Sequence, residues 1–193
     1  MLDYQTYDLS TVFLLLVLVV AALIDLRRNR IPNWLTFSTL GIGLSLQLIF
    51  LGSDGFINGL SGAGVGLALL LPFFLMGGMG AGDVKLMAAV GCFIGTTPVL
   101  LATAFSLLLA GGYALLLIGV KGQLSAFMQR YMVSVQTRTW ILPETNSIAR
   151  RRFPFALAIA GGTVIALGWY SKLDFYHLTS ELSYQWQLLG VGQ

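Results

Sequence analysis

The apolar run at residues 84–120, VKLMAAVGCFIGTTPVLLATAFSLLLAGGYALLLIGV, is 37 residues long and contains no acidic side chain. As a single helix it would be roughly 55 Å long, whereas the hydrocarbon core of a bilayer is roughly 30 Å thick. A helix break is therefore expected inside the run, and the turn-forming segment Gly95-Thr96-Thr97-Pro98 is the place for it. The run predicts two membrane spans, at about residues 84–97 and 99–120.

The rest of the chain has the same character. Hydrophobic residues make up 56% of the 193 residues, charged residues only 10%, and the mean hydropathy is +0.82. These values are typical of a membrane protein that crosses the bilayer several times, and they exclude an ordinary soluble domain. We expect an all-α protein with six transmembrane helices in a single integral membrane domain, residues 1–193. The other four predicted spans are at about residues 9–26, 34–51, 56–76 and 153–171.

The positions of the basic residues predict how these spans are oriented. With the N-terminus outside, ten of the eleven lysine and arginine residues fall on the inner side, and Lys172 is the exception. This distribution follows the positive-inside rule, so both termini are expected outside. The formal net charge of +3 is then explained by the membrane, and we expect membrane lipid but no nucleic acid as a partner.

Two segments outside the spans have helical periodicity with an apolar face. Residues 121–140 are predicted to form an amphipathic helix on the cytoplasmic surface, and the periplasmic tail, residues 172–193, repeats the pattern more weakly. Each is interpreted as a surface anchor, and the alternative is a docking site for a partner protein.

Two aspartates stand at the inner ends of predicted spans, Asp25 at the end of the first and Asp83 at the start of the fourth. The fourth span has 14 residues and is roughly 21 Å long, about 9 Å short of the hydrocarbon thickness. If its outer end reaches the interface, Asp83 lies below the inner one. Acidic residues at that depth are costly and normally face a protein interior or a wet cavity.

Each aspartate alone could be a helix cap or the partner of a nearby arginine. Together, two carboxyl groups in a poorly hydrated site can share one proton, as in aspartic proteases, where the pair activates water and protonates the leaving nitrogen. Gly80 and Gly82 precede Asp83 and would let the backbone lie against an extended substrate. Lys85 points to nearly the opposite side of a regular helix, so we interpret it as an anchor of the helix end, with substrate contact as the alternative.

Two segments resemble one known family. Gly80-Ala81-Gly82-Asp83-Val84-Lys85-Leu86 resembles the GxGDxKL signature of type IV prepilin peptidases, and residues 24–36, IDLRRNRIPNWLT, are similar to that family's first-aspartate segment. The resemblance covers about residues 9–171. It implies that Asp25 and Asp83 are the catalytic pair of a membrane aspartic endopeptidase in the bacterial inner membrane. Its implied substrates are prepilin or pseudopilin precursors, whose basic leader peptide is cut at the cytoplasmic face.

The sequence departs from the long members of that family. Those members carry an N-terminal region with a four-cysteine zinc site and methylate the new N-terminus with S-adenosylmethionine, whereas this sequence has a single cysteine, Cys92, inside an apolar run. It resembles the short form of tight-adherence pilus systems, so we expect no zinc, no cofactor and no N-methyltransferase activity. The family's late PFG segment is incomplete here, as Phe153-Pro154-Phe155-Ala156-Leu157.

Some roles and functions stay open at the level of sequence. Arg27, with Arg28 and Arg30, is expected to orient the first span, and the alternative is contact with an acidic residue of the precursor. Other functions are a catalytically silent pilus-assembly scaffold and a proton-coupled transporter. A signal-peptide or presenilin-like peptidase would share the Gly-x-Gly-Asp pattern, but the Ile31-Pro32-Asn33 segment argues against it.

Overall fold

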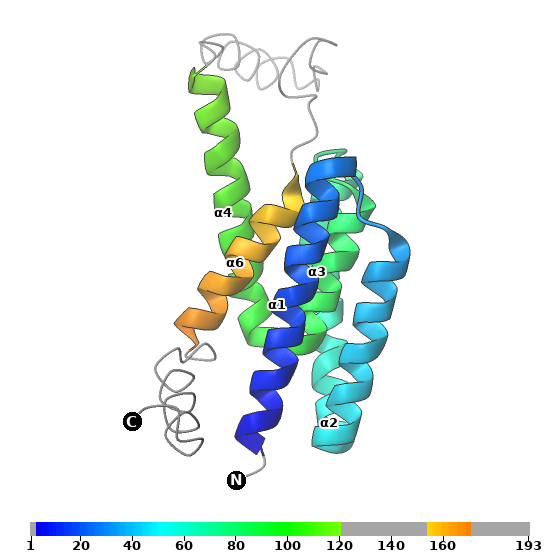
Figure 1. Cartoon of the computed structure of the whole chain (residues 1–193). Helices are drawn as coiled ribbons and strands as arrows, with labels where there is room; N and C mark the ends of the chain where they lie inside the picture. The colour runs from blue at the N-terminus through cyan, green and yellow to red at the C-terminus, as the bar shows by residue number, and fades with distance from the viewer. Residues whose placement is uncertain (1–2, 121–153, 171–193) are drawn as a thin grey trace, which may run out of the picture.

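The computed structural model describes residues 3–120 and 154–170, and throughout these ranges the protein is helical, without a strand (Figure 1). The prediction of an all-α protein is therefore confirmed for the described residues. The predicted surface helix at 121–140 and the tail at 172–193 lie outside them. The five helices are α1 (Asp3–Arg28), α2 (Asn33–Leu75), α3 (Ala81–Ile94), α4 (Thr96–Val120) and α6 (Phe155–Trp169).

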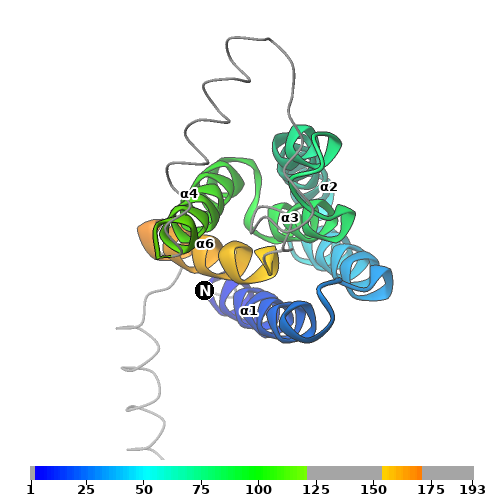
Figure 2. The ribbon, with the colours of Figure 1, turned by 90° about the horizontal axis from the view of Figure 1, so that it is seen from above.

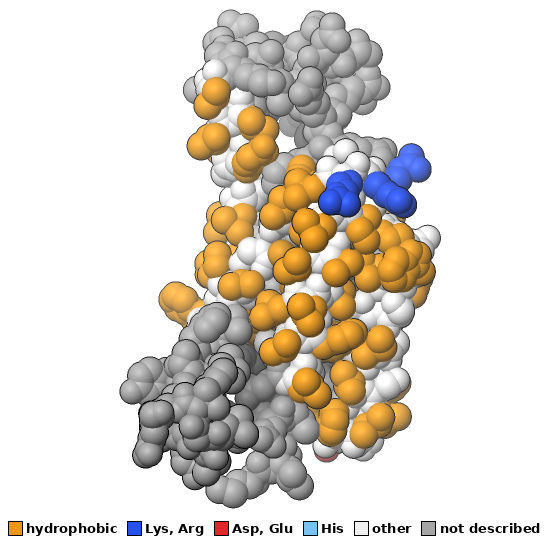
Figure 3. Space-filling model, viewed as in Figure 1, with side chains coloured by type: hydrophobic (Ala, Val, Ile, Leu, Met, Phe, Trp, Pro, Cys, Tyr) orange, Lys and Arg blue, Asp and Glu red, His pale blue; other side chains and the backbone are white. Residues whose placement is uncertain are grey.

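Three of these helices are long and apolar enough to cross a membrane, namely α1, α2 and α4. The helix α6 is apolar but has 15 residues, fewer than the span predicted at 153–171. Large hydrophobic side chains are exposed over most of the surface, as Figure 3 shows for one face. This surface suits contact with lipid, and the six spans and their orientation stay predictions.

The helix α2 is a hairpin rather than one straight rod. Gly52 alone leaves helical geometry, with φ 64° and ψ −150°, a conformation that glycine adopts without steric cost. A Cβ atom placed on Gly55 would lie 2.6 Å from the backbone oxygen of Gln47, so the two halves face each other. Figure 1 shows α2 running away from the end of α1 and then returning. Spans predicted at 34–51 and 56–76 correspond to these two halves, and the predicted loop between them is reduced to a turn at Gly52.

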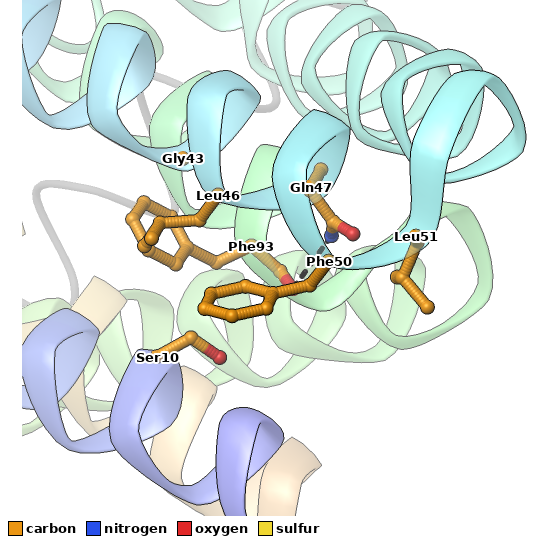
Figure 4. A pocket seen from close by; sticks show the side chains of 7 residues that line it. All are labelled: Ser10, Gly43, Leu46, Gln47, Phe50, Leu51 and Phe93. Carbon is orange, nitrogen blue, oxygen red and sulfur yellow. Dashed lines mark hydrogen bonds between the residues drawn. The ribbon is translucent and has the colours of Figure 1, made fainter. Parts of the chain in front are cut away.

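The predicted break after α3 is confirmed. The helix ends at Ile94, Gly95 has a φ of 83°, and α4 begins at Thr96. The last carbonyl groups of a helix have no partner within it. Here the Gln47 side chain supplies one, because its Nε2 donates to the oxygens of Cys92 at 3.1 Å and Phe93 at 3.3 Å. Figure 4 shows this contact beside a small cavity of about 30 Å³ between α1, α2 and α3.

The short helix α3 is the centre of the bundle. It contacts all four other helices, and Figure 2 shows it enclosed by them. Its close approach to the second half of α2 depends on glycine, because a Cβ atom on Gly62 would collide with the backbone oxygen of Gly91, and one on Gly66 would lie 2.6 Å from that of Met87. Small residues allow this contact between helix backbones in lipid. The central helix therefore places its first turn in protein surroundings.

Candidate active site

Asp83 is held by the first turn of α3. Its carboxylate Oδ2 accepts the N–H of Gly80 at 2.9 Å, and its own N–H donates to the carbonyl of Gly80 at 3.1 Å. The side chain is 8% exposed. A carboxylate that caps the start of its own helix is also favoured by the helix dipole. Asp83 is thus fixed in one orientation by its own backbone.

Asp25 is held from another part of the chain. It lies near the end of α1, is 5% exposed, and its Oδ2 accepts the backbone N–H of Ala156 at 3.2 Å. Ala156 is in the first turn of α6, where N–H groups have no partner within the helix. The start of α6 therefore donates a hydrogen bond to the buried carboxylate of Asp25 and orients it.

The two carboxyl groups line one cavity of about 480 Å³. Three further parts of the chain complete its wall: the turn after α1, the end of α2 with the glycine-rich segment after it, and Phe155 of α6. The cavity lies at the end of the bundle where α1 ends and α3 begins. Sequence reasoning placed Asp25 and Asp83 on the same side, and in the structure they face the same space.

Gly80 and Gly82, the two glycines predicted to shape the site, make different contacts. Gly80 lines the cavity and supplies the N–H that holds Asp83. Gly82 also lines the cavity, but a Cβ atom on it would lie 3.0 Å from Cβ and 3.3 Å from the carbonyl oxygen of Ile31. Gly82 therefore allows the two segments quoted for the family resemblance to pack closely, a role that the sequence did not suggest.

Lys85 does not line the cavity. Its Nζ donates to Oδ1 of Asn33 at 2.9 Å and lies 5.0 Å above the ring of Phe37, both in the first turns of α2. This agrees with the interpretation of Lys85 as an anchor of the helix end. The contact joins the lysine of one family segment to the asparagine of the other.

Among the described residues, Arg30 is the basic one that lines the cavity, and the predicted Arg27 does not line it. Asn29 ends α1 with a φ of 49°, which asparagine tolerates better than most residues, and its N–H donates to the carbonyl of Asp25 at 2.7 Å. This turn directs Arg30 and Ile31 to the cavity wall. Arg27, one helical turn earlier, lines a separate groove on the outside of α1.

Phe155 and the N–H of Ala156 were missed as site groups. Both belong to the incomplete PFG segment at residues 153–157, to which the sequence alone assigned no role. A backbone N–H can bind a carboxylate whatever side chain it carries, so alanine at position 156 keeps the contact.

The described residues that line the site offer two carboxyl groups and include neither a histidine nor a cysteine. Within residues 3–120 and 154–170, no three or more His, Cys, Asp or Glu side chains come together as metal ligands would. Two buried carboxyl groups, each held by one backbone N–H, can exchange protons with a water or an amide between them.

Residues 12–115 match the sequence profile described as the type IV leader peptidase family, which is more than half of the chain and includes Asp25 and Asp83. A prepilin leader peptidase/N-methyltransferase of Bacillus subtilis (strain 168) is 29% identical over 163 residues, which is 82% of this chain and 55% of the relative. The chain therefore spans about half the length of that curated relative. No solved structure matches the sequence.

Proposed function

Because the chain belongs to the type IV leader peptidase family, we propose that it is a membrane aspartic endopeptidase that removes the basic leader peptide from type IV prepilins or pilin-like precursors. The observation that supports this most directly is the pair of buried carboxyl groups, Asp25 from α1 and Asp83 from α3, on one cavity. Acid–base cleavage of an amide needs one group that takes a proton from water and one that gives a proton to the leaving nitrogen, and two carboxyl groups on one cavity can fill both roles.

The proposed chemistry uses one proton shared by the two aspartates. Two neighbouring carboxyl groups with little solvent are most stable with a single negative charge between them. The ionised group takes a proton from water as the water oxygen bonds to the scissile carbonyl carbon. The protonated group gives its proton to the amide nitrogen as the carbon–nitrogen bond breaks. Each carboxyl group ends in the state in which the other began.

The proposed location is the bacterial inner membrane, with six spans, both termini outside and the cavity facing the cytoplasm. Arg27, Arg28 and Arg30 support this orientation because they lie at the cavity end of α1, and basic residues favour the cytoplasmic side. A basic leader peptide would then reach the cavity from the side on which precursors are made.

Cleavage of a purified precursor tests the proposal. The detergent-solubilised protein is incubated with a candidate prepilin, and the products are identified by mass spectrometry. Asp25→Asn and Asp83→Asn are each expected to lower the cleavage rate by roughly 10²- to 10⁴-fold, because neither amide can exchange the proton. Asp54→Asn is the matched control, because Asp54 is exposed beside the turn of α2 and does not line the cavity.

The same experiment has outcomes that contradict the proposal. Cleavage by either active-site variant at the wild-type rate would exclude a two-aspartate mechanism. Binding of the precursor without cleavage by the wild type would favour an assembly scaffold. With S-adenosylmethionine added as the methyl donor, the mass of the mature product also shows whether its new N-terminus carries a methyl group.

A further inference from the structure

A second hollow of about 800 Å³ lies beside the candidate active site, on the outside of the bundle between the last turns of α1 and the start of α2. Among residues 3–120 and 154–170, the charged side chains that line it are all basic. We call it the arginine groove and define it by six of its lining residues: Val20, Leu23, Arg27, Arg28, Arg30 and Trp34.

The three arginines of the groove are exposed. Within residues 3–120 and 154–170, no hydrogen bond or ion pair is made by their guanidinium groups. A guanidinium group has five N–H donors in a planar fork that fits the oxygens of a phosphate. Three such groups on one hollow, with no carboxylate among the described residues that line it, are complementary to an anion.

The other wall of the groove is apolar and faces outward. Val20 and Leu23 precede Arg27 at helical spacing on one face of α1 and are 43% and 51% exposed, and Trp34 at the start of α2 is 66% exposed. Figure 3 shows the basic side chains together at one end of the visible face, directly above a broad hydrophobic surface. Tryptophan is enriched at the level of lipid headgroups. The groove thus has a cationic end and an apolar end in the order in which a phospholipid has them.

We propose that the arginine groove binds an anionic phospholipid of the surrounding membrane. The phosphate of the headgroup contacts Arg27, Arg28 and Arg30, and the upper part of an acyl chain lies along Val20 and Leu23 beside Trp34. Charge complementarity supports a lipid of net negative charge over a zwitterionic one, and the exposed apolar wall supports a lipid over a soluble anion. Arg30 lines both this groove and the aspartate cavity, so the bound lipid lies next to the site.

Retention of individual lipids tests this site independently of peptidase activity. The full-length protein is exchanged into detergent with phosphatidylglycerol or phosphatidylcholine, and the bound lipids are counted by native mass spectrometry. Wild-type protein is expected to retain phosphatidylglycerol preferentially. The triple variant Arg27→Gln, Arg28→Gln, Arg30→Gln is expected to bind it roughly 10- to 100-fold more weakly. The matched control is Arg27→Lys, Arg28→Lys, Arg30→Lys, which keeps the three positive charges of the groove and is expected to retain most of the binding.

A single substitution tests the same site without depending on whether the triple variant folds. Trp34→Ala leaves every charge in place, and because Trp34 is largely exposed its loss costs the fold little. It is expected to weaken phosphatidylglycerol retention several-fold. Retention of both lipids equally by the wild type, or equal losses in the two triple variants, would overturn the proposal. So would displacement of the lipid by inorganic phosphate, which would indicate a site for a soluble anion, or by an acidic precursor segment, which would indicate a protein-binding surface.

Discussion

The carboxylates of Asp25 and Asp83 are each held by a backbone N–H, from Ala156 and Gly80 respectively. A backbone donor is fixed by the path of its helix, so the orientation of each aspartate depends on where α3 and α6 begin. Ala156 is fully buried beside Asp25. A larger side chain at this position would have to displace the start of α6 or the residues packed against it.

Ala156→Leu is expected to lower precursor cleavage by roughly tenfold or more, because an enlarged side chain in a packed site costs about 1–3 kcal/mol and moves the start of α6 away from Asp25. Ala156→Gly keeps the N–H and is expected to cleave at close to the wild-type rate. The rates are measured with the prepilin assay on protein that still accumulates in the membrane. Equal rates for the two variants would show that the contact to Asp25 has no role in cleavage.

Lys85 and Asn33 are expected to be energetically coupled. A double-mutant cycle with Lys85→Met and Asn33→Leu should give a coupling free energy of about 0.5–1 kcal/mol for unfolding, because their 2.9 Å hydrogen bond lies at the surface. Reversible unfolding in mixed micelles measures it. Strictly additive effects would mean that the bond contributes nothing to the attachment of α3 to α2.

At the scale of helices, the contact between α2 and α3 is set by a row of glycines. Gly59, Gly62 and Gly66 are buried on one side of the second half of α2, and Cβ atoms on them would meet the backbone of a neighbouring helix. The sequence predicts that small residues let helices approach, but periodicity alone does not identify the partner helix. In the structure the partner is α3, the helix that carries Asp83.

Gly62→Ala and Gly64→Ala form a matched pair on one helix. A Cβ atom on Gly62 meets the backbone of Gly91, whereas one on Gly64 meets nothing within 4 Å. Gly62→Ala is expected to lower the free energy of unfolding by about 1–3 kcal/mol, and Gly64→Ala to leave it unchanged or raise it slightly. Thermal unfolding of the two purified variants gives the comparison, and a more stable Gly62→Ala protein would contradict the close contact.

The helix breaks were predictable, since Gly95 is followed by threonines and a proline and the break lies there. The turn at Gly52 was approximated as a loop at 52–55. The break at Gly95 was predicted because a 37-residue helix is longer than the membrane is thick, and the turn at Gly52 because two apolar runs are separated there. In both places glycine adopts the backbone geometry that the break needs.

The details of the site were less predictable, because they depend on contacts between distant segments. Asp25 and Asp83 stand out as acids in apolar surroundings. Arg30 lines the cavity and Arg27 does not, because the chain makes a left-handed turn at Asn29. Helical spacing in the sequence does not predict this turn. The hydrogen bond from the N–H of Ala156 to Asp25 depends on the packing of α6 against α1. An alanine in the sequence gives no indication of such a contact.

At the scale of the whole molecule, orientation in the membrane is the main prediction that cysteine labelling can test. In a Cys92→Ala background, Ser53→Cys places a thiol at the exposed turn of α2, and Met76→Cys places one at the cavity end. A membrane-impermeant maleimide is expected to label Ser53→Cys in intact spheroplasts and Met76→Cys only after lysis. The reverse pattern would mean that the cavity faces outward.

The bond from Ala156 to Asp25 joins residues 131 positions apart. During biosynthesis, α1 to α4 are made before α6, so a ribosome-bound chain already has both aspartates but lacks the donor that orients one of them. The buried carboxyl group of Asp25 therefore gains this backbone donor only when the chain has been made as far as the start of α6.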